Sequence, residues 1–354
     1  MATAVASFQW FFWGFSLTFS HAAGRFIGNL DNIGFKNVLA QPSVGSPVIP
    51  DLLFAVHQDM FAAITVARAV GAACGGGRII PYVIFMFIWT TVVYDPIACW
   101  TWNPSGWVYE LGGLDFAGGT PIHISSGSAA LTSSFLLGKR TGYGTQLLNY
   151  RPHNVTPIVI GTVSLLVCTN LAACVRGVTW CLVDYRLERK WSVVGFCSDV
   201  IAGLVATTPG SGYAPAWVAV VYGVCAGIGC KFATHIKYWV HADDGLDIFA
   251  VHGIGGLIGT LLTRLFDADY ITHLDSYTAI PPGWLNRHWI QRAIQLCESV
   301  AGTIYSFAVT LLILGVMSVI GWYIPAFVLR KTPAEESREL MMLRWASSHM
   351  IMWR

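Results

Sequence analysis

Nine apolar segments, separated by shorter polar stretches, set the hydropathy pattern of this 354-residue chain. A helix needs about 20 apolar residues to cross the hydrocarbon core of a bilayer, and most of the segments are close to that length or longer. We therefore predict an all-α polytopic membrane protein with about eight or nine transmembrane helices. They fall within Ala2–Ser20, Leu52–Ala73, Ile79–Cys99, Pro121–Leu137, Val155–Val183, Val193–Ala206, Ala214–Phe232, Ile248–Phe266 and Ala293–Leu329.

Cationic residues cluster in four of the connections and mark the cytoplasmic side by the positive-inside rule. The clusters are Gly138–Arg140, Arg186–Lys190, Lys231 with Lys237, and Arg330–Lys331. The chain turns polar from Thr332, so we predict a membrane domain over residues 1–329 and a cytosolic tail over 330–354. Two long polar loops, Arg25–Pro50 and Asp267–Arg292, are expected outside the membrane.

Composition supports this class and excludes others. Hydrophobic residues make up 55% of the chain, charged residues 11%, and the mean hydropathy is +0.57, whereas soluble domains carry about 25% charged residues. The net charge of +2, without a basic stripe, gives no sign of a nucleic-acid partner. The nine cysteines are scattered, with neither a CxxC pair nor a Cys/His cluster, so we expect packing residues, no metal, no cofactor and no enzymatic activity.

Two histidines stand out because each follows an aspartate by eight residues and opens a glycine-rich apolar run. His123 follows Asp115, and His252 follows Asp244, in opposite halves of the chain. A single intramembrane histidine is more often a packing residue, but a duplicated ionisable pair marks a path for an ion or small polar solute. Two neutral imidazoles can share a proton in a narrow lumen, so we expect these two to face each other across one path.

The aspartates have two open interpretations. Asp115 precedes Gly118 and Gly119 at a predicted helix start, where a carboxylate caps free amides or favours a nearby cation. Asp244 and Asp247 occupy a similar helix-entry position. The glycines that follow His252 are expected to permit close helix approach rather than phosphate binding; they are Gly253, Gly255, Gly256 and Gly259.

Aromatic side chains crowd the segment before Asp115. They form either an interfacial belt or a vestibule that attracts cations through indole faces. These residues are Tyr94, Trp100, Trp102 and Trp107.

Four blocks of sequence resemble the Amt/Mep/Rh ammonium transporter family, and its fungal Mep branch most of all. They are DFAGGTPIHISSG at Asp115–Gly127, LVDYRLERKWSVVGFC at Leu182–Cys197, TPGSGYAP at Thr208–Pro215 and LDIFAVHGIGGLIG at Leu246–Gly259. The resemblance implies eleven transmembrane helices, in two inverted five-helix halves plus a final helix. It also implies a plasma-membrane homotrimer with one ammonium or ammonia pore per subunit.

The same resemblance assigns roles to individual residues. His123 and His252 match the twin pore histidines, and Asp115 and Trp102 match the outer ammonium-recruitment site. Phe61 matches one of two stacked gate phenylalanines. Tyr94 and Ile248 fall at positions that resemble the pore wall.

The chain also departs from the family pattern. It begins inside what resembles the second helix, and a stretch with a W-F-G-F-N motif is missing between Val167 and Cys168. Arg68 stands where the family has an aliphatic pore residue; because it follows Phe61 by two helical turns, we expect it in or beside the lumen. The family pattern has an acidic residue shortly before the position of Arg78, and the glycines Gly75–Gly77 stand there instead. Further charges in apolar segments each cost about 2.5–3.5 kcal/mol on insertion scales; they are Asp59, Arg176, Asp199 and Arg264.

These features leave several hypotheses about function. The leading one is ammonium transport through a pore lined by the twin histidines. The alternatives are a non-conducting homologue that acts as a sensor or as a subunit of mixed trimers, and the product of a decayed or misassembled gene. A membrane metalloenzyme or haem protein is disfavoured because carboxylate and cysteine ligands at metal spacing are missing. Between Arg151 and Arg186 we further expect a single helix or a shallow re-entrant pair, since two full crossings need about 40 residues.

Overall fold

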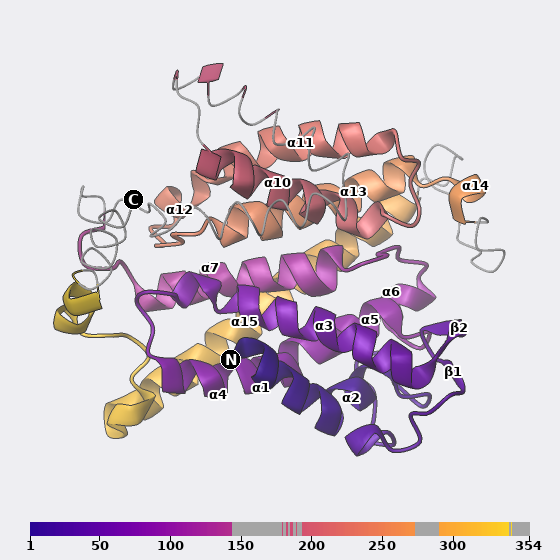
Figure 1. Ribbon diagram of the computed structural model, residues 1–354, viewed down its shortest axis with the longest axis horizontal. Coiled ribbons are helices and arrows are strands. Elements are labelled where there is room, and N and C mark those ends of the chain that lie inside the picture. Colours follow the sequence, from indigo (N-terminus) through magenta and orange to yellow (C-terminus); the bar gives the residue numbers. More distant parts are fainter. Residues whose placement is uncertain are drawn as a thin grey trace, which may run out of the picture.

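The computed structural model describes residues 1–143, 193–272 and 290–339, together with five positions between Thr179 and Arg189 and with Met341. The described chain is predominantly helical, as the hydropathy pattern predicts (Figure 1). The predicted segment Val155–Val183 and the connection between Arg151 and Arg186 fall almost entirely outside these residues. Within them, five helices are long and apolar enough to cross a membrane. These are Asp51–Ala73, Ile79–Glu110, Val218–Trp239, Phe249–Phe266 and Ala293–Tyr323.

The first half of the chain forms a layer of long helices, three of which contain a π-helical turn. The first helix runs through α1 (Ala2–Gln9), η1 (Trp10–Gly14) and α2 (Phe15–Phe19). The second helix is α3 (Asp51–Ala69), which is followed by the 3-10 turn η3 (Gly71–Ala73). The third runs through α4 (Ile79–Trp89), η4 (Thr90–Tyr94) and α5 (Asp95–Trp102), and the short α6 (Trp107–Glu110) follows it. The last helix of this half consists of η5 (Gly119–Ile124) and α7 (Ser125–Leu137).

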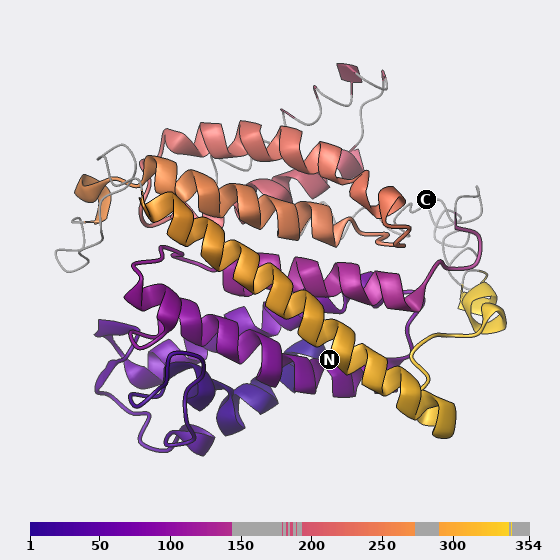
Figure 2. The ribbon, with the colours of Figure 1, turned by 180° about the vertical axis from the view of Figure 1, so that it is seen from behind.

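The second half is also helical and again contains a π-helical turn, and the last long helix packs on both halves. Its elements are α10 (Val193–Thr207), η6 (Thr208–Gly210), α11 (Val218–Ala233), α12 (Ile236–Trp239), η7 (Phe249–Ile254) with α13 (Gly255–Phe266), and α14 (Asp269–Thr272). Helix α15 (Ile290–Tyr323) runs diagonally across both halves on one side of the molecule (Figure 2). It ends before Leu329, where the hydropathy pattern placed its end, because Pro325 opens a 3-10 turn (η10, Pro325–Phe327) and cannot continue the helix.

The predicted polar loop Arg25–Pro50 contains the only strands in the described part of the chain. Strands β1 (Pro42–Ser43) and β2 (Ser46–Pro50) pair antiparallel, with Pro42 opposite Pro50 and Ser43 opposite Ser46. A 3-10 turn, η2 (Ile33–Phe35), precedes them. This hairpin adds a detail to the all-α prediction without changing the class.

Helix α7 lies between the two halves because its side chains are small (Figure 1). Ser125, Ser126, Gly127 and Ser128 are all buried, and a Cβ on Gly127 would collide with the backbone of Gly253. Small residues let helix backbones approach closely in membranes. The hydroxyls of Ser125 and Ser126 bond to the carbonyls of Pro121 and Ile122 one turn earlier, each at 2.5 Å, so these two buried polar groups have partners.

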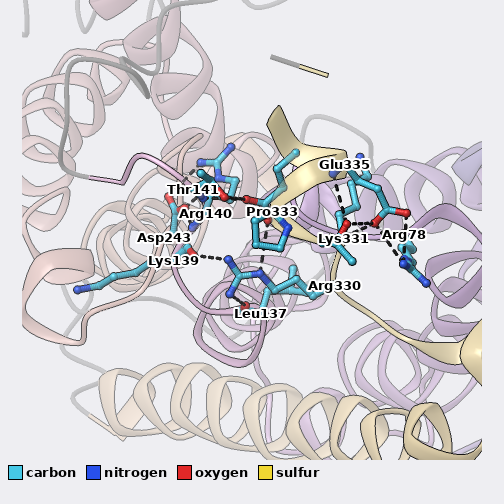
Figure 3. A network of polar contacts seen from close by, with 12 residues as sticks. Arg78, Leu137, Lys139, Arg140, Thr141, Asp243, Arg330, Lys331, Pro333 and Glu335 are labelled. Carbon is cyan, nitrogen blue, oxygen red and sulfur yellow. Dashed lines mark hydrogen bonds and ion pairs between the residues drawn. The ribbon is translucent and has the colours of Figure 1, made fainter. Parts of the chain in front are cut away.

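The cationic connections around Arg140 and Arg330 lie together, and the beginning of the tail packs on them (Figure 3). Arg140 forms an ion pair with Asp243 at 2.9 Å, and Arg330 donates to the carbonyl oxygens of Leu137 and Lys139 at 3.1 and 2.5 Å. The backbone of Lys331 donates to Gly76 O at 2.8 Å. The predicted tail is therefore docked in its described part, and residues 333–339 form a short helix.

Glu336 fixes this docking, and its substitution tests the arrangement. Its carboxylate accepts bonds from the Thr141 amide at 2.8 Å and the Thr141 hydroxyl at 2.6 Å. Burial alone would raise the pKa of Glu336, but these bonds and the charge of Arg330 outweigh it and hold the pKa below its ordinary value. The docking therefore contributes stability above the unfolded-state pKa of about 4.3 and loses it as the pH falls through the lower folded-state value.

We expect Glu336→Gln to expose the Thr141 amide, because a neutral amide group replaces a charged acceptor. Hydrogen exchange at Thr141 at pH 7 should accelerate about tenfold or more, since bonds to charged groups contribute about 1.5–3 kcal/mol. Glu335→Gln is the matched control, because Glu335 belongs to the same helix but bonds to Arg78 instead. Equal exchange rates in both variants would contradict the docking.

Candidate functional site

The two histidines lie side by side on matching π-helical turns. His123 belongs to η5 and His252 to η7, and each ring is almost fully buried. Their Nδ1 atoms are 3.1 Å apart, and the rings are stacked with centroids 5.3 Å apart and planes 7° apart. The matched Asp-to-His spacing predicted that the imidazoles would meet, and the distance agrees with it. A π-turn inserts an extra residue into a helix and often occurs at functional sites.

Arg68 of α3 contacts His123 of this pair. Its Nη1 lies 3.4 Å from His123 Nδ1, and it lines a cavity of about 340 Å³ together with Phe61 and His123. This agrees with the prediction that Arg68 and Phe61, seven residues apart, face one side of their helix. Among the described residues, no carboxylate lies within 4.0 Å of this guanidinium.

The contacts determine how the protons are arranged on the pair. A guanidinium can only donate, so His123 Nδ1 must present its lone pair to Arg68. The proton of the neutral His123 ring is then on Nε2, which donates to Thr208 Oγ1 at 3.2 Å. The Thr208 hydroxyl in turn donates to Leu204 O at 2.7 Å. His123 Nδ1 has a single lone pair, so a proton on His252 Nδ1 would share that lone pair with Arg68.

Trp102 and Asp115 lie beside Phe61, which is an aromatic residue of the cavity wall. The rings of Phe61 and Trp102 lie 6.1 Å apart, and Trp102 Nε1 donates to the backbone oxygen of Asp115 at 2.8 Å. The Asp115 carboxylate accepts the amides of Gly118, Gly119 and Thr120 at 2.8, 2.7 and 2.6 Å. Of the two interpretations of Asp115, the structure shows the cap: it holds the turn that carries His123.

The helix-entry carboxylates of the second half act in a similar way. Asp244 accepts the amide of Phe249 at 2.9 Å and so caps the turn that carries His252. Asp247 forms an ion pair with Lys237 at 2.7 Å. Ile248 is buried against Ala72 and Ala130, next to the end of α3.

Tyr94 lies elsewhere. It is fully buried within the first half, with its ring 6.2 Å from that of Trp10, and it is not among the described residues that line the cavity. The π-turn η4 that contains it directs the ring toward the first helix.

A buried polar cluster beside Asp115 escaped the sequence analysis. Arg264, predicted as a costly charge, is fully buried and binds Gln295 at 3.1 Å, Asp267 at 3.5 Å and the carbonyl of Gly112. Gln295 also binds both backbone polar groups of Leu114 and donates to Glu298 at 2.8 Å. The sequence does contain a sign of this cluster, because Gln295 and Glu298 are three residues apart and so share one face of a mostly apolar helix.

The sequence analysis named three other charges in apolar segments, and their surroundings differ from those of Arg264. Asp59 accepts a hydrogen bond from Ser7 at 2.8 Å. Arg176 and the side chain of Asp199 lie outside the described residues.

The Arg264 cluster supports a stability prediction. Removing one member of a buried ion pair leaves an uncompensated charge and costs about 3–5 kcal/mol. We therefore expect Arg264→Met to lower the thermal unfolding temperature of the detergent-purified protein, because Asp267 and Glu298 lose their cation. The double variant Arg264→Met with Glu298→Gln should recover part of the loss. Unchanged stability of the single variant would show that the cluster contributes nothing.

Comparison with known proteins places the chain in a family. The model of the Ammonium Transporter Family matches it over residues 1–168 and 163–348, in two pieces that overlap at residues 163–168. Ammonium transporter 1 of Schizosaccharomyces pombe is 50% identical over 359 residues, which cover 95% of this chain and 71% of the relative. Ammonium transporter MEP2 of Saccharomyces cerevisiae is 45% identical over 365 residues, covering 95% and 72%. The crystal structure of Saccharomyces cerevisiae Mep2 superposes with a TM-score of 0.86 at 44% identity, over 94% of this chain and 78% of that one. The chain is therefore a multi-pass membrane protein that belongs to the ammonium transporter family.

Proposed function

We propose that this chain provides a transmembrane path for ammonium or ammonia, with His123 and His252 at its narrow middle. The observation that carries the proposal is the stacked imidazole pair, with its Nδ1 atoms 3.1 Å apart and with His123 in the wall of a largely apolar cavity. Neutral imidazoles offer a donor and an acceptor to a small polar solute, whereas the desolvation cost excludes bare ions. Membership of the family and the transporters among its relatives support the same substrate.

The other site residues take roles along this path. Trp102 and Phe61 stand at the end where ammonium enters, and an indole face attracts such cations. Asp115 and Asp244 act by positioning the turns that carry the histidines, and the charge of Asp115 also favours a cation nearby. Asp247 is the second helix-entry carboxylate. Ile248 belongs to the wall beyond the histidines, whereas Tyr94 packs against Trp10 within the first half and takes no part in the wall of this cavity.

Arg68 opposes conduction of a cation. Two unit charges 4 Å apart repel by about 4 kcal/mol at the effective dielectric constant of 20 typical of protein sites. An ammonium ion that reaches the imidazoles meets this guanidinium, so we expect little uptake by the unaltered chain. This observation favours a second candidate function, a non-conducting homologue that acts as a sensor or as a subunit of mixed trimers. The family match in two pieces also keeps open the product of an altered or misassembled gene.

Three further features belong to this proposal. We place the protein in the plasma membrane as a homotrimer, by analogy with its family. Residues 1–329 form the membrane domain and residues 330–354 the cytosolic tail, and the cationic loops around Arg140 and Arg330 lie on the cytoplasmic side.

Replacing Arg68 tests the transport proposal. We expect Arg68→Leu to raise ammonium uptake by about tenfold or more, because it removes a repulsion worth several kcal/mol and restores an apolar wall. Uptake would be measured with the full chain in proteoliposomes, as the alkalinisation or acidification that follows an ammonium pulse.

Two further variants serve as controls. Arg25→Leu removes an exposed arginine that pairs with Glu110, far along the chain from the histidines, and should leave uptake unchanged. Adding His123→Ala to Arg68→Leu should abolish the gain. Strong uptake by the unaltered chain would refute the role of Arg68, and no gain in Arg68→Leu would favour the non-conducting homologue.

A further inference from the structure

The cavity beside His123 contains a fixed positive charge, and no carboxylate among the described residues lies within ion-pair distance of it. Arg68 is partly exposed to this space, and its contact with another side chain is that with the neutral His123 ring. We propose that the cavity is a binding site for a small, weakly hydrated monovalent anion such as chloride or nitrate. The inference rests on the geometry around Arg68 and does not depend on the transport proposal.

The hydrogen-bonding capacity of Arg68 supports an anion. A guanidinium has five N–H donors, and the contact with His123 uses one of them. A buried or half-buried charge without a partner is costly, and pairing with an opposite charge lowers that cost. No carboxylate of the described chain lies within ion-pair distance, so a soluble anion can pair with this guanidinium.

The rest of the cavity wall favours anions that are weakly hydrated. Most of the wall is apolar, with Phe61, Ile64, Ile122, Leu204 and Val205 among its members. An apolar wall penalises strongly hydrated ions, which would lose their water without replacement. Weakly hydrated monovalent anions lose least, so chloride and nitrate are favoured over sulfate or phosphate.

The hydroxyl groups of the wall are already engaged as donors. Thr207 donates to Gly203 O at 3.1 Å, Thr208 to Leu204 O at 2.7 Å, and Ser211 to Thr208 O at 3.0 Å. Arg68 therefore supplies the charged donors for an anion, and its substitution removes the site rather than one of several ligands.

The size of the cavity fits a small ion with some water. Its volume is about 340 Å³, whereas a water molecule takes about 30 Å³ in the liquid. A chloride ion together with a few waters fits this space.

Chloride binding to the purified full chain tests the proposal. The protein would be held in detergent micelles at constant ionic strength, with sodium gluconate exchanged for sodium chloride, and the excess line width of the chloride-35 resonance measured. We expect broadening with the unaltered chain that nitrate reverses by competition. Arg68→Leu should weaken chloride binding about tenfold or more, the equivalent of losing one charge-assisted hydrogen bond.

Control variants separate a specific site from general effects. Arg25→Leu also removes one arginine, but an exposed one, and should retain the broadening. Arg68→Lys should retain weaker binding because the charge remains, and Arg68→Gln replaces Arg68→Leu if the latter fails to fold. Equal broadening in Arg68→Leu or Arg68→Gln and in the unaltered chain would overturn the proposal, as would no broadening in the unaltered chain. Ammonium uptake plays no part in the measurement, so its failure would not bear on this result.

Discussion

The contact between the Arg68 guanidinium and the stacked imidazoles governs the chemistry of this molecule. The imidazole pair alone would be a neutral place in an apolar path, with a donor and an acceptor for a small polar solute. Arg68 adds a permanent positive charge 3.4 Å from His123 and donates to that ring. It lines a cavity, and no acid among the described residues pairs with it. Under the proposed function, Arg68 is therefore an obstacle to a cation beside the imidazoles.

The need to satisfy polar groups in apolar surroundings explains much of the remaining structure. Two arginines in apolar helices differ in whether neighbouring groups compensate their charge. Arg264 binds Gln295, Asp267 and a backbone carbonyl, so its charge is compensated. Gln295 in turn binds the backbone of Leu114, the residue just before Asp115. Arg68 has no such acid in the described chain. The first arginine acts as a structural element, and the second is available for a ligand.

The sequence predicted the elements that depend on local pattern and spacing. The helices within the described chain follow the apolar segments, because burial in lipid requires long apolar runs. The meeting of His123 with His252 followed from duplicated spacing, and the position of Arg68 followed from its two-turn distance from Phe61. The caps formed by Asp115 and Asp244 were one of two readings of a carboxylate at a helix start.

Features that depend on distant segments were not predictable in this way. Thr208 becomes a partner of His123 because η6 is folded against η5, which no local pattern in TPGSGYAP shows. The docking of the tail joins Glu336 to Thr141 across 195 positions, and Gln295 meets Leu114 across 181. The end of α15 was misjudged because hydropathy continues past Pro325, whereas the backbone cannot.

The nitrogen-15 resonances of His123 test the central contact most directly. With histidine labelled in the full chain in lipid nanodiscs, the contact predicts that Nδ1 carries no proton and Nε2 carries one, and that Arg68→Leu releases this preference. His123 resonances that show a protonated Nδ1 in the unaltered chain, or that do not change in Arg68→Leu, would contradict the account.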